Sequence, residues 1–162
     1  MEQNYLQPEE KKKLPATLNV LTILTFIGCG IFGLYTLLSP WLSKIFLKFM
    51  DDAVNSGKEL SEKQLADIER GRAMIELAMQ NMVPLMIIGL AGILLCLVGA
   101  IWMRKLKKDG FWLYTAGELG PLIAMPFIMG VEQFKGVGGI MSIVVPVAFV
   151  IMYAMQRKHL VN

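Results

Sequence analysis

The chain has 162 residues, of which 55% are hydrophobic and 18% are charged, and its formal net charge is +3. A hydrophobic share this large, gathered into long blocks, excludes an ordinary soluble domain, whose helices and strands would alternate apolar and polar faces. The net charge is too small to predict nucleic acid as a partner. The composition instead predicts an integral membrane protein whose surroundings are the lipid bilayer.

Four apolar blocks follow one another along the chain, at residues 16–38, 83–103, 111–130 and 136–155. Each is close to the ~20 residues that a helix rising ~1.5 Å per residue needs to cross a ~30 Å hydrocarbon core. We therefore predict an all-α fold in which four transmembrane helices form a bundle. This membrane domain comprises residues 16–156, between tails at 1–15 and 157–162.

The first block contains Gly28, Gly30 and Gly33, whose spacing matches the fingerprint of dinucleotide-binding proteins. That fingerprint needs a preceding strand and a turn whose free backbone amides face a pyrophosphate. Amides inside an apolar helix are already bonded. We therefore interpret these glycines as helix-packing positions, where small residues let a neighbouring helix approach closely. The same interpretation applies to three glycines of the second block, Gly89, Gly92 and Gly99.

The two cysteines, Cys29 and Cys96, lie in the first and second blocks. Counted from the inner ends of their helices, their depths differ by roughly 9 Å, which is beyond disulfide reach unless the helices are offset or tilted. We interpret both as small packing residues. His159 is the only histidine, so the chain lacks the residues for a histidine-rich metal site or a Ser-His-Asp triad. We predict no metal, no cofactor and no enzymatic activity.

Residues 41–82 separate the first two blocks and carry two amphipathic patterns. Residues 61–64 predict a capping box that opens the second of two helices. No breaker follows it until Pro84, and Pro40 and Pro84 are expected to kink the two spans as they leave the bilayer. We predict an extramembrane helical hairpin that continues the two spans; the alternative is a pair of interfacial helices lying flat on the membrane. The apolar positions of the first helix are Leu42, Phe46, Phe49 and Ala53.

Glu118 is a carboxylate about seven residues, or roughly 10 Å, inside the third block. Burying a carboxylate at that depth costs at least ~2.5 kcal/mol, so its side chain should face the bundle or a wet cavity. Gly117, Gly120 and Pro121 surround it. We therefore expect this helix to be kinked or unwound there, as helices are at the ion sites of transporters.

Two roles for Glu118 follow from this position. As a structural residue, it would hydrogen-bond to a neighbour such as Asn19, Thr22 or an interfacial water and would fix helix packing. As a functional residue, it would bind or pass a proton or a cation. The sequence shows neither a second charge inside the blocks nor an inverted repeat, which favours the structural role.

Basic residues predict the orientation of the chain. The positive-inside rule places the side that carries them, and with it both termini, in the cytoplasm. The other side has only Lys44, Lys48 and Lys135 close to the membrane. The basic residues that four spans bring to one side are Lys11, Lys12, Lys13, Arg104, Lys105, Lys107, Lys108, Arg157 and Lys158.

A family resemblance lies in residues 107–121. A basic pair is followed by Asp109, a glycine–aromatic turn, a tyrosine, and then Gly117 before Glu118. This pattern resembles one found in small, uncharacterised four-span bacterial inner-membrane proteins. The resemblance implies a four-span fold and a bacterial inner membrane, and it carries over neither an activity nor a functional residue.

Two functions fit these features. The first is a structural or accessory subunit that binds other membrane proteins, or a second copy of itself, through its small-residue helix faces and its hairpin. The second is a small transporter or a proton- or cation-handling protein centred on Glu118. The first is our leading hypothesis because no second charge accompanies that carboxylate.

Overall fold

The computed structural model describes residues 14–56 and 61–160, and within these ranges the protein is helical without a strand. This confirms the predicted all-α fold. The lysines at 11–13, the glycine at 57 and the last two residues lie outside the described ranges. The helices are α1 (Ala16–Asn55), α2 (Glu62–Gln80), α3 (Met82–Arg104), α4 (Asp109–Met129) and α5 (Gly136–Gln156), with the short 3-10 helices η1 (Val131–Phe134) and η2 (Arg157–His159).

Three helical segments are long and apolar enough to cross a membrane: Ala16–Asn55, Met82–Arg104 and Gly136–His159. The segment predicted as a span at 111–130 is helical, as part of α4, but α4 is not among these three. Its length of 21 residues equals that of α5. Its sequence is interrupted by Glu118 and two internal prolines, which lowers its hydrophobicity.

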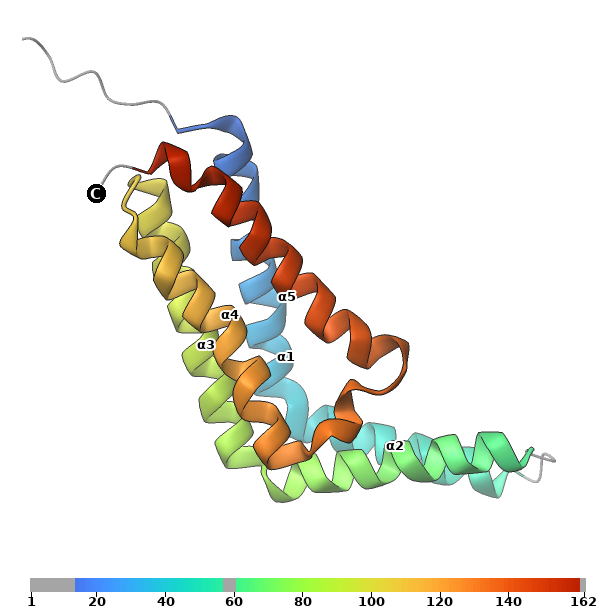
Figure 1. The fold of residues 1–162 in the computed structure, drawn as a ribbon. Helices are drawn as coiled ribbons and strands as arrows, with labels where there is room; N and C mark the ends of the chain where they lie inside the picture. Colours follow the sequence, from blue (N-terminus) through green and yellow to red (C-terminus); the bar gives the residue numbers. More distant parts are fainter. Residues whose placement is uncertain (1–13, 57–60, 161–162) are drawn as a thin grey trace, which may run out of the picture.

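The antiparallel pair of α3 and α4 forms the tightest contact of the fold, and α1 packs against α3 (Figure 1). Four glycines, Gly92 and Gly99 of α3 with Gly110 and Gly117 of α4, form what we call the glycine seam. A Cβ atom on Gly99 would lie 2.5 Å from the backbone nitrogen of Tyr114 and 2.7 Å from the carbonyl oxygen of Gly110. The backbones of the two helices are therefore in direct contact, and the seam has no room for side chains.

The buried core lies at one end of the bundle, where all four long helices meet. The rings of Tyr114 and Tyr153 are in contact there, with centroids 4.4 Å apart and their planes tilted by 54°. The same end carries the basic α3–α4 connection, and the guanidinium of Arg157 lies 5.2 Å from the ring centroid of Phe111. The core cluster comprises Leu18, Leu21, Cys96, Met103, Phe111, Tyr114, Tyr153 and Leu160.

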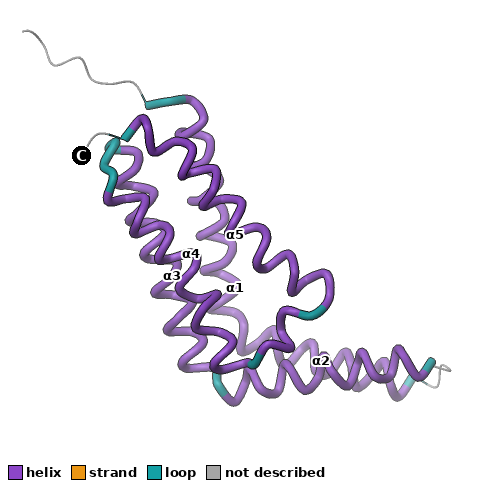
Figure 2. The backbone as a smooth tube through the Cα atoms, viewed as in Figure 1, coloured by secondary structure: helices purple, strands orange, loops and turns teal. Residues whose placement is uncertain are grey.

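α1 is twice as long as a membrane span, because its 40 residues extend about 60 Å against a ~30 Å hydrocarbon core. Its C-terminal part turns aside from the bundle (Figure 2). Pro40 lies within α1 and cannot donate a hydrogen bond to the carbonyl of Thr36, four residues earlier. The hydroxyl of Ser39 donates to that carbonyl instead, at 2.8 Å. The backbone thus stays satisfied where the ladder is interrupted.

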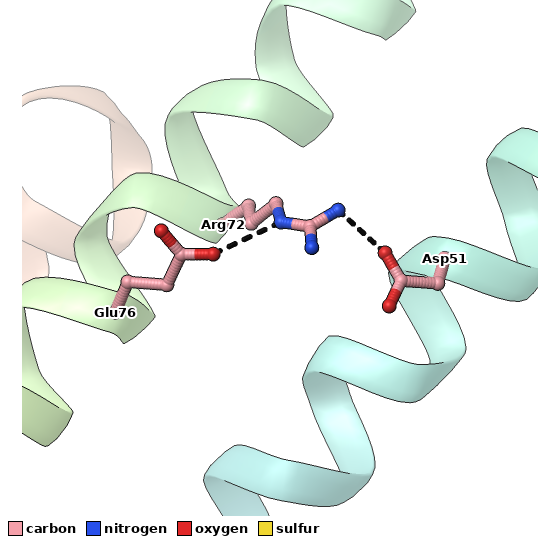
Figure 3. Close-up of polar contacts among 3 residues, drawn as sticks. All are labelled: Asp51, Arg72 and Glu76. Atoms are coloured by element: carbon pink, nitrogen blue, oxygen red, sulfur yellow. Dashed lines mark hydrogen bonds and ion pairs between the residues drawn. The ribbon is translucent and has the colours of Figure 1, made fainter.

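The C-terminal part of α1 and α2 run antiparallel and in contact (Figure 1). Arg72 of α2 pairs with Asp51 of α1 at 2.5 Å and with Glu76 of its own helix at 3.0 Å (Figure 3). Both acids raise the pKa of Arg72, mainly through the hydrogen bond that its guanidinium donates to Glu76. The predicted capping box is confirmed, since Ser61 and Gln64 exchange hydrogen bonds at the start of α2. This pair of segments, residues 41–56 and 61–80, is called the hairpin below.

The junction between α2 and α3 lies at Asn81, so the expectation of an unbroken helix up to Pro84 is wrong. α2 ends at Gln80 and α3 begins at Met82. The side-chain amide of Asn81 donates to the carbonyl of Leu77 at 3.0 Å, and asparagine commonly ends helices in this way. Pro84 falls in the first turn of α3, where its missing N–H leaves no bond unmade.

Candidate functional site: the cavity around Glu118

α5 diverges from the other three long helices toward its N-terminal end (Figure 1). The divergence leaves a cavity of about 550 Å³ bordered by α1, α3, α4, η1 and α5. Its walls are mostly apolar, and Glu118 is the carboxylate that lines it. The volume accommodates several large side chains or a small molecule, but not a helix about 10 Å across.

The cavity opens to the side of the bundle, between α1 and α5. Residues that both line the cavity and are exposed to the outside mark this opening. The opening therefore lies between exposed, mostly apolar side chains of α1 and α5. The rim residues are Leu24, Gly28 and Phe32 of α1, with Gly138, Met141, Ser142 and Val145 of α5.

Glu118 is half-buried in the cavity wall. The hydroxyl of Tyr114, one helical turn earlier on α4, donates to its carboxylate at 2.8 Å. The hydroxyl of Tyr153 on α5 is hydrogen-bonded to that of Thr25 on α1, also at 2.8 Å. Because the two tyrosine rings are in contact, Glu118 is joined through Tyr114 to the contact between α5 and α1.

Asn19 and Thr22, which were considered as hydrogen-bond partners of Glu118, do not bond to it in the described part of the chain. The hydroxyl of Thr22 donates to the backbone carbonyl of Asn19 at 2.9 Å, within α1. A threonine inside a helix often bonds its own backbone in this way. A tyrosine at i−4 needs no neighbouring helix to reach the carboxylate, and sequence spacing alone could have identified it.

No basic side chain neutralises Glu118 within residues 14–56 and 61–160. The ion pairs in these ranges are Arg72 with Asp51 and Glu76, and Lys135 with Glu132. The described part of the chain also brings no three His, Cys, Asp or Glu residues together as a metal site would need. Glu118 is therefore a single acceptor of protons or cations in an apolar wall.

The third block was expected to be kinked or unwound around Glu118. The backbone there stays helical, so the unwound alternative is wrong, and a kink remains a prediction. α4 continues through Pro121 and Pro126 to Met129. Pro121 releases the carbonyl of Gly117 from the helical ladder. That carbonyl lies against Gly92 of α3, 3.0 Å from where a Cβ would stand. Gly120, by contrast, faces open space.

The glycines predicted as packing positions occupy three different environments. Gly89, Gly92 and Gly99 are buried in α3, and Gly89 contacts the side chain of Thr36. Gly33 lies near Ile93. Gly28 and Gly30 face open space, with no atom within 4 Å of a Cβ built on either. Gly28 belongs to the cavity rim, whereas Gly30 does not line the cavity.

Cys29 and Cys96 both line the cavity, and their thiols are neighbours. Both are free cysteines. Counting residues from the inner ends of the two helices predicted different depths for these cysteines, because it assumed that the inner ends of α1 and α3 lie at the same level. The guanidinium of Arg104, the last residue of α3, instead lies 5.9 Å from the ring centroid of Phe26, well inside α1. The two helices are therefore offset along the bundle.

Gln133 is a cavity residue that sequence analysis did not identify. It lies on η1, and its side-chain nitrogen is buried without a hydrogen-bond partner in the described part of the chain. Leaving such a donor unpaired costs ~1–3 kcal/mol. The short segment after α4 that contains it is too short to show a hydrophobic periodicity in the sequence. Gln133 therefore borders the cavity, while its unpaired nitrogen is enclosed by neighbouring atoms.

Comparison of the chain with protein-family models, with curated proteins and with solved structures finds no match. The site is therefore interpreted from its own residues.

Proposed function

We propose that the protein is a four-span bacterial inner-membrane protein with both termini in the cytoplasm. The proposal adds α4 to the three apolar helices, because α4 packs against α3 through the glycine seam. The polar groups of α4 then face the cavity and not lipid. The basic residues at the α3–α4 connection and after α5 favour the cytoplasmic side for that end of the bundle.

Two cysteine positions test this topology. Ser56 at the end of the hairpin and Lys158 in η2 are both exposed, so Ser56→Cys and Lys158→Cys should leave folding unchanged. In intact cells, a membrane-impermeant maleimide should label the cysteine at 56 and not the one at 158. In inside-out vesicles the pattern should reverse. Labelling of both positions from one side would contradict the three spans that the proposal places between them.

Within that topology, we propose that the protein acts as an accessory subunit that associates with another membrane-embedded chain. The observation that supports this is the lateral opening between α1 and α5. Side chains of a neighbouring helix packed across the rim can enter a cavity that a whole helix cannot. Gly28 and Gly138, which have no atom within 4 Å of a Cβ, would let its backbone approach closely.

A matched pair of glycine substitutions tests this association. Gly28→Leu places a bulky side chain on the cavity rim, and Gly30→Leu places one on the same helix outside the cavity. A Cβ at either position has no atom within 4 Å, so thermal stability should be retained in both. Gly28→Leu should weaken association at least tenfold, or ~1.4 kcal/mol, while Gly30→Leu leaves it unchanged. Energy transfer between labelled copies in vesicles measures self-association, and quantitative co-purification from native membranes measures association with a different chain. Equal effects of the two substitutions would contradict a partner at the opening.

A second candidate function is proton or cation handling at Glu118. It is favoured by one specific observation: the carboxylate lines a cavity and has no basic neighbour among the described residues. Protonation or a bound cation would remove the cost of a charge in an apolar wall. This candidate predicts ion flux in vesicles that contain the purified protein alone.

A further inference from the structure

An exposed apolar stripe runs along α1 through the bend that follows its bundle-packed part. Its residues, spaced by four, three, four and four, lie on one side of the helix. Leu34 and Leu38 belong to the part of α1 that packs beside α3. Trp41, Ile45 and Phe49 belong to the hairpin, where their exposed fractions are 62%, 45% and 70%. The stripe comprises Leu34, Leu38, Trp41, Ile45 and Phe49.

The hairpin runs across the end of the bundle, not along the bundle axis (Figures 1 and 2). If the bundle axis crosses a bilayer, a segment that leaves it sideways follows the membrane surface. The stripe then continues from the hydrocarbon core into the interface without a polar interruption. Asp52, which is exposed one turn beyond Phe49, marks its end.

The residues beside the stripe match the chemistry of a lipid surface. Trp41 stands at the bend, and tryptophan is enriched where helices meet the headgroup region. Lys44 and Lys48 are exposed and lie three residues after Trp41 and Ile45. Their long side chains can reach phosphate groups while their stems lie along the apolar face. The other side of this segment contacts α2, where Asp51 pairs with Arg72.

We propose that the hairpin is an interfacial element that lies on the lipid surface, with Trp41, Ile45 and Phe49 inserted below the headgroups and α2 covering its other side. The proposal rests on α1 crossing the membrane, which is part of the proposed function. It selects the interfacial alternative over a hairpin that projects into water. Such an element would fix the tilt and depth of α1 and hold the cavity at a set level in the bilayer.

Tryptophan fluorescence in vesicles tests the proposal. Trp102→Phe and Trp112→Phe leave Trp41 as the single tryptophan of the chain. Two further proteins in this background carry Trp41→Phe with either Leu34→Trp or Ala73→Trp. Leu34 is on the stripe in the bundle-packed part of α1. Ala73 is exposed on α2 between Glu69 and Glu76, so its substitution is the matched water-facing control.

Each protein is reconstituted in phosphatidylcholine and phosphatidylglycerol vesicles, with and without brominated acyl chains. We expect brominated chains to remove most of the emission of Trp41 and of the Leu34→Trp probe, with little effect on the Ala73→Trp probe. Aqueous acrylamide should quench the Ala73→Trp probe alone. If acrylamide quenches Trp41 while brominated chains quench the Leu34→Trp probe, the hairpin projects into water and the proposal is overturned. If brominated chains fail to quench the Leu34→Trp probe, α1 does not cross the membrane, and the four-span topology is overturned with it.

Discussion

Gly99→Ala should lower the stability of the folded protein by ~3 kcal/mol, because it adds an atom where two backbones touch. The new Cβ would lie 2.5 Å from the nitrogen and 2.9 Å from the Cα of Tyr114, and 2.7 Å from the carbonyl oxygen of Gly110. Backbone atoms of a helix cannot move away by changing a rotamer. The seam between α3 and α4 must therefore open, and Tyr114 moves with it. Thermal unfolding in a mild detergent measures the loss.

Gly120→Ala is the matched control, because it makes the same chemical change at a position of α4 with no atom within 4 Å. Alanine is the better helix former by ~1 kcal/mol, so this variant should be as stable as the natural sequence or slightly more stable. Similar destabilisation by the two substitutions would show that the loss comes from the helix and not from the seam. That result would contradict the close backbone contact between α3 and α4.

The seam also illustrates what the sequence can predict. Gly92 and Gly99 are seven residues apart, as are Gly110 and Gly117, so each pair lies on one side of its helix after about two turns. Spacing therefore identifies faces that permit close approach. It does not identify which faces meet. Gly28 and Gly30 also lie in an apolar helix, and yet they face open space. That outcome depends on the rotation of α1 about its axis, which neighbouring helices determine.

Helix positions followed from hydrophobic length, whereas junctions and offsets did not. The predicted blocks end within one or two residues of α3, α4 and α5, because an apolar run of about 20 residues has few other structures to adopt. The junction at Asn81 depends on one side-chain hydrogen bond. The proximity of Cys29 and Cys96 depends on the offset between α1 and α3. The hydrogen bond from Tyr114 to Glu118 was not predicted, because the candidate partners lay on α1 and Tyr114 lies on α4 with Glu118.

Glu118→Gln should separate the two proposed functions without unfolding the protein. The amide keeps an oxygen that can accept the hydrogen bond from Tyr114, now 2.8 Å long. We therefore expect the thermal stability of this variant to stay within ~0.5 kcal/mol of the natural sequence. The amide cannot take up or release a proton, and it has no negative charge to pair with a cation. If Glu118 handles protons or cations, flux measured with a pH-sensitive or cation-sensitive dye in vesicles should be lost.

Glu118→Leu and Tyr114→Phe provide the structural comparison, since each removes one partner of the same hydrogen bond. Both should destabilise the protein by ~1–2 kcal/mol, and the double variant should lose less than the sum of the two. Flux that survives in Tyr114→Phe but disappears in Glu118→Gln would assign the activity to the carboxylate itself. Flux that is absent from the natural protein, together with association that Glu118→Gln leaves intact and Gly28→Leu weakens, would overturn cation handling and support the accessory subunit. In that case Glu118 serves to hold Tyr114, and through it Tyr153 and α5, in the arrangement that keeps the cavity open to a partner.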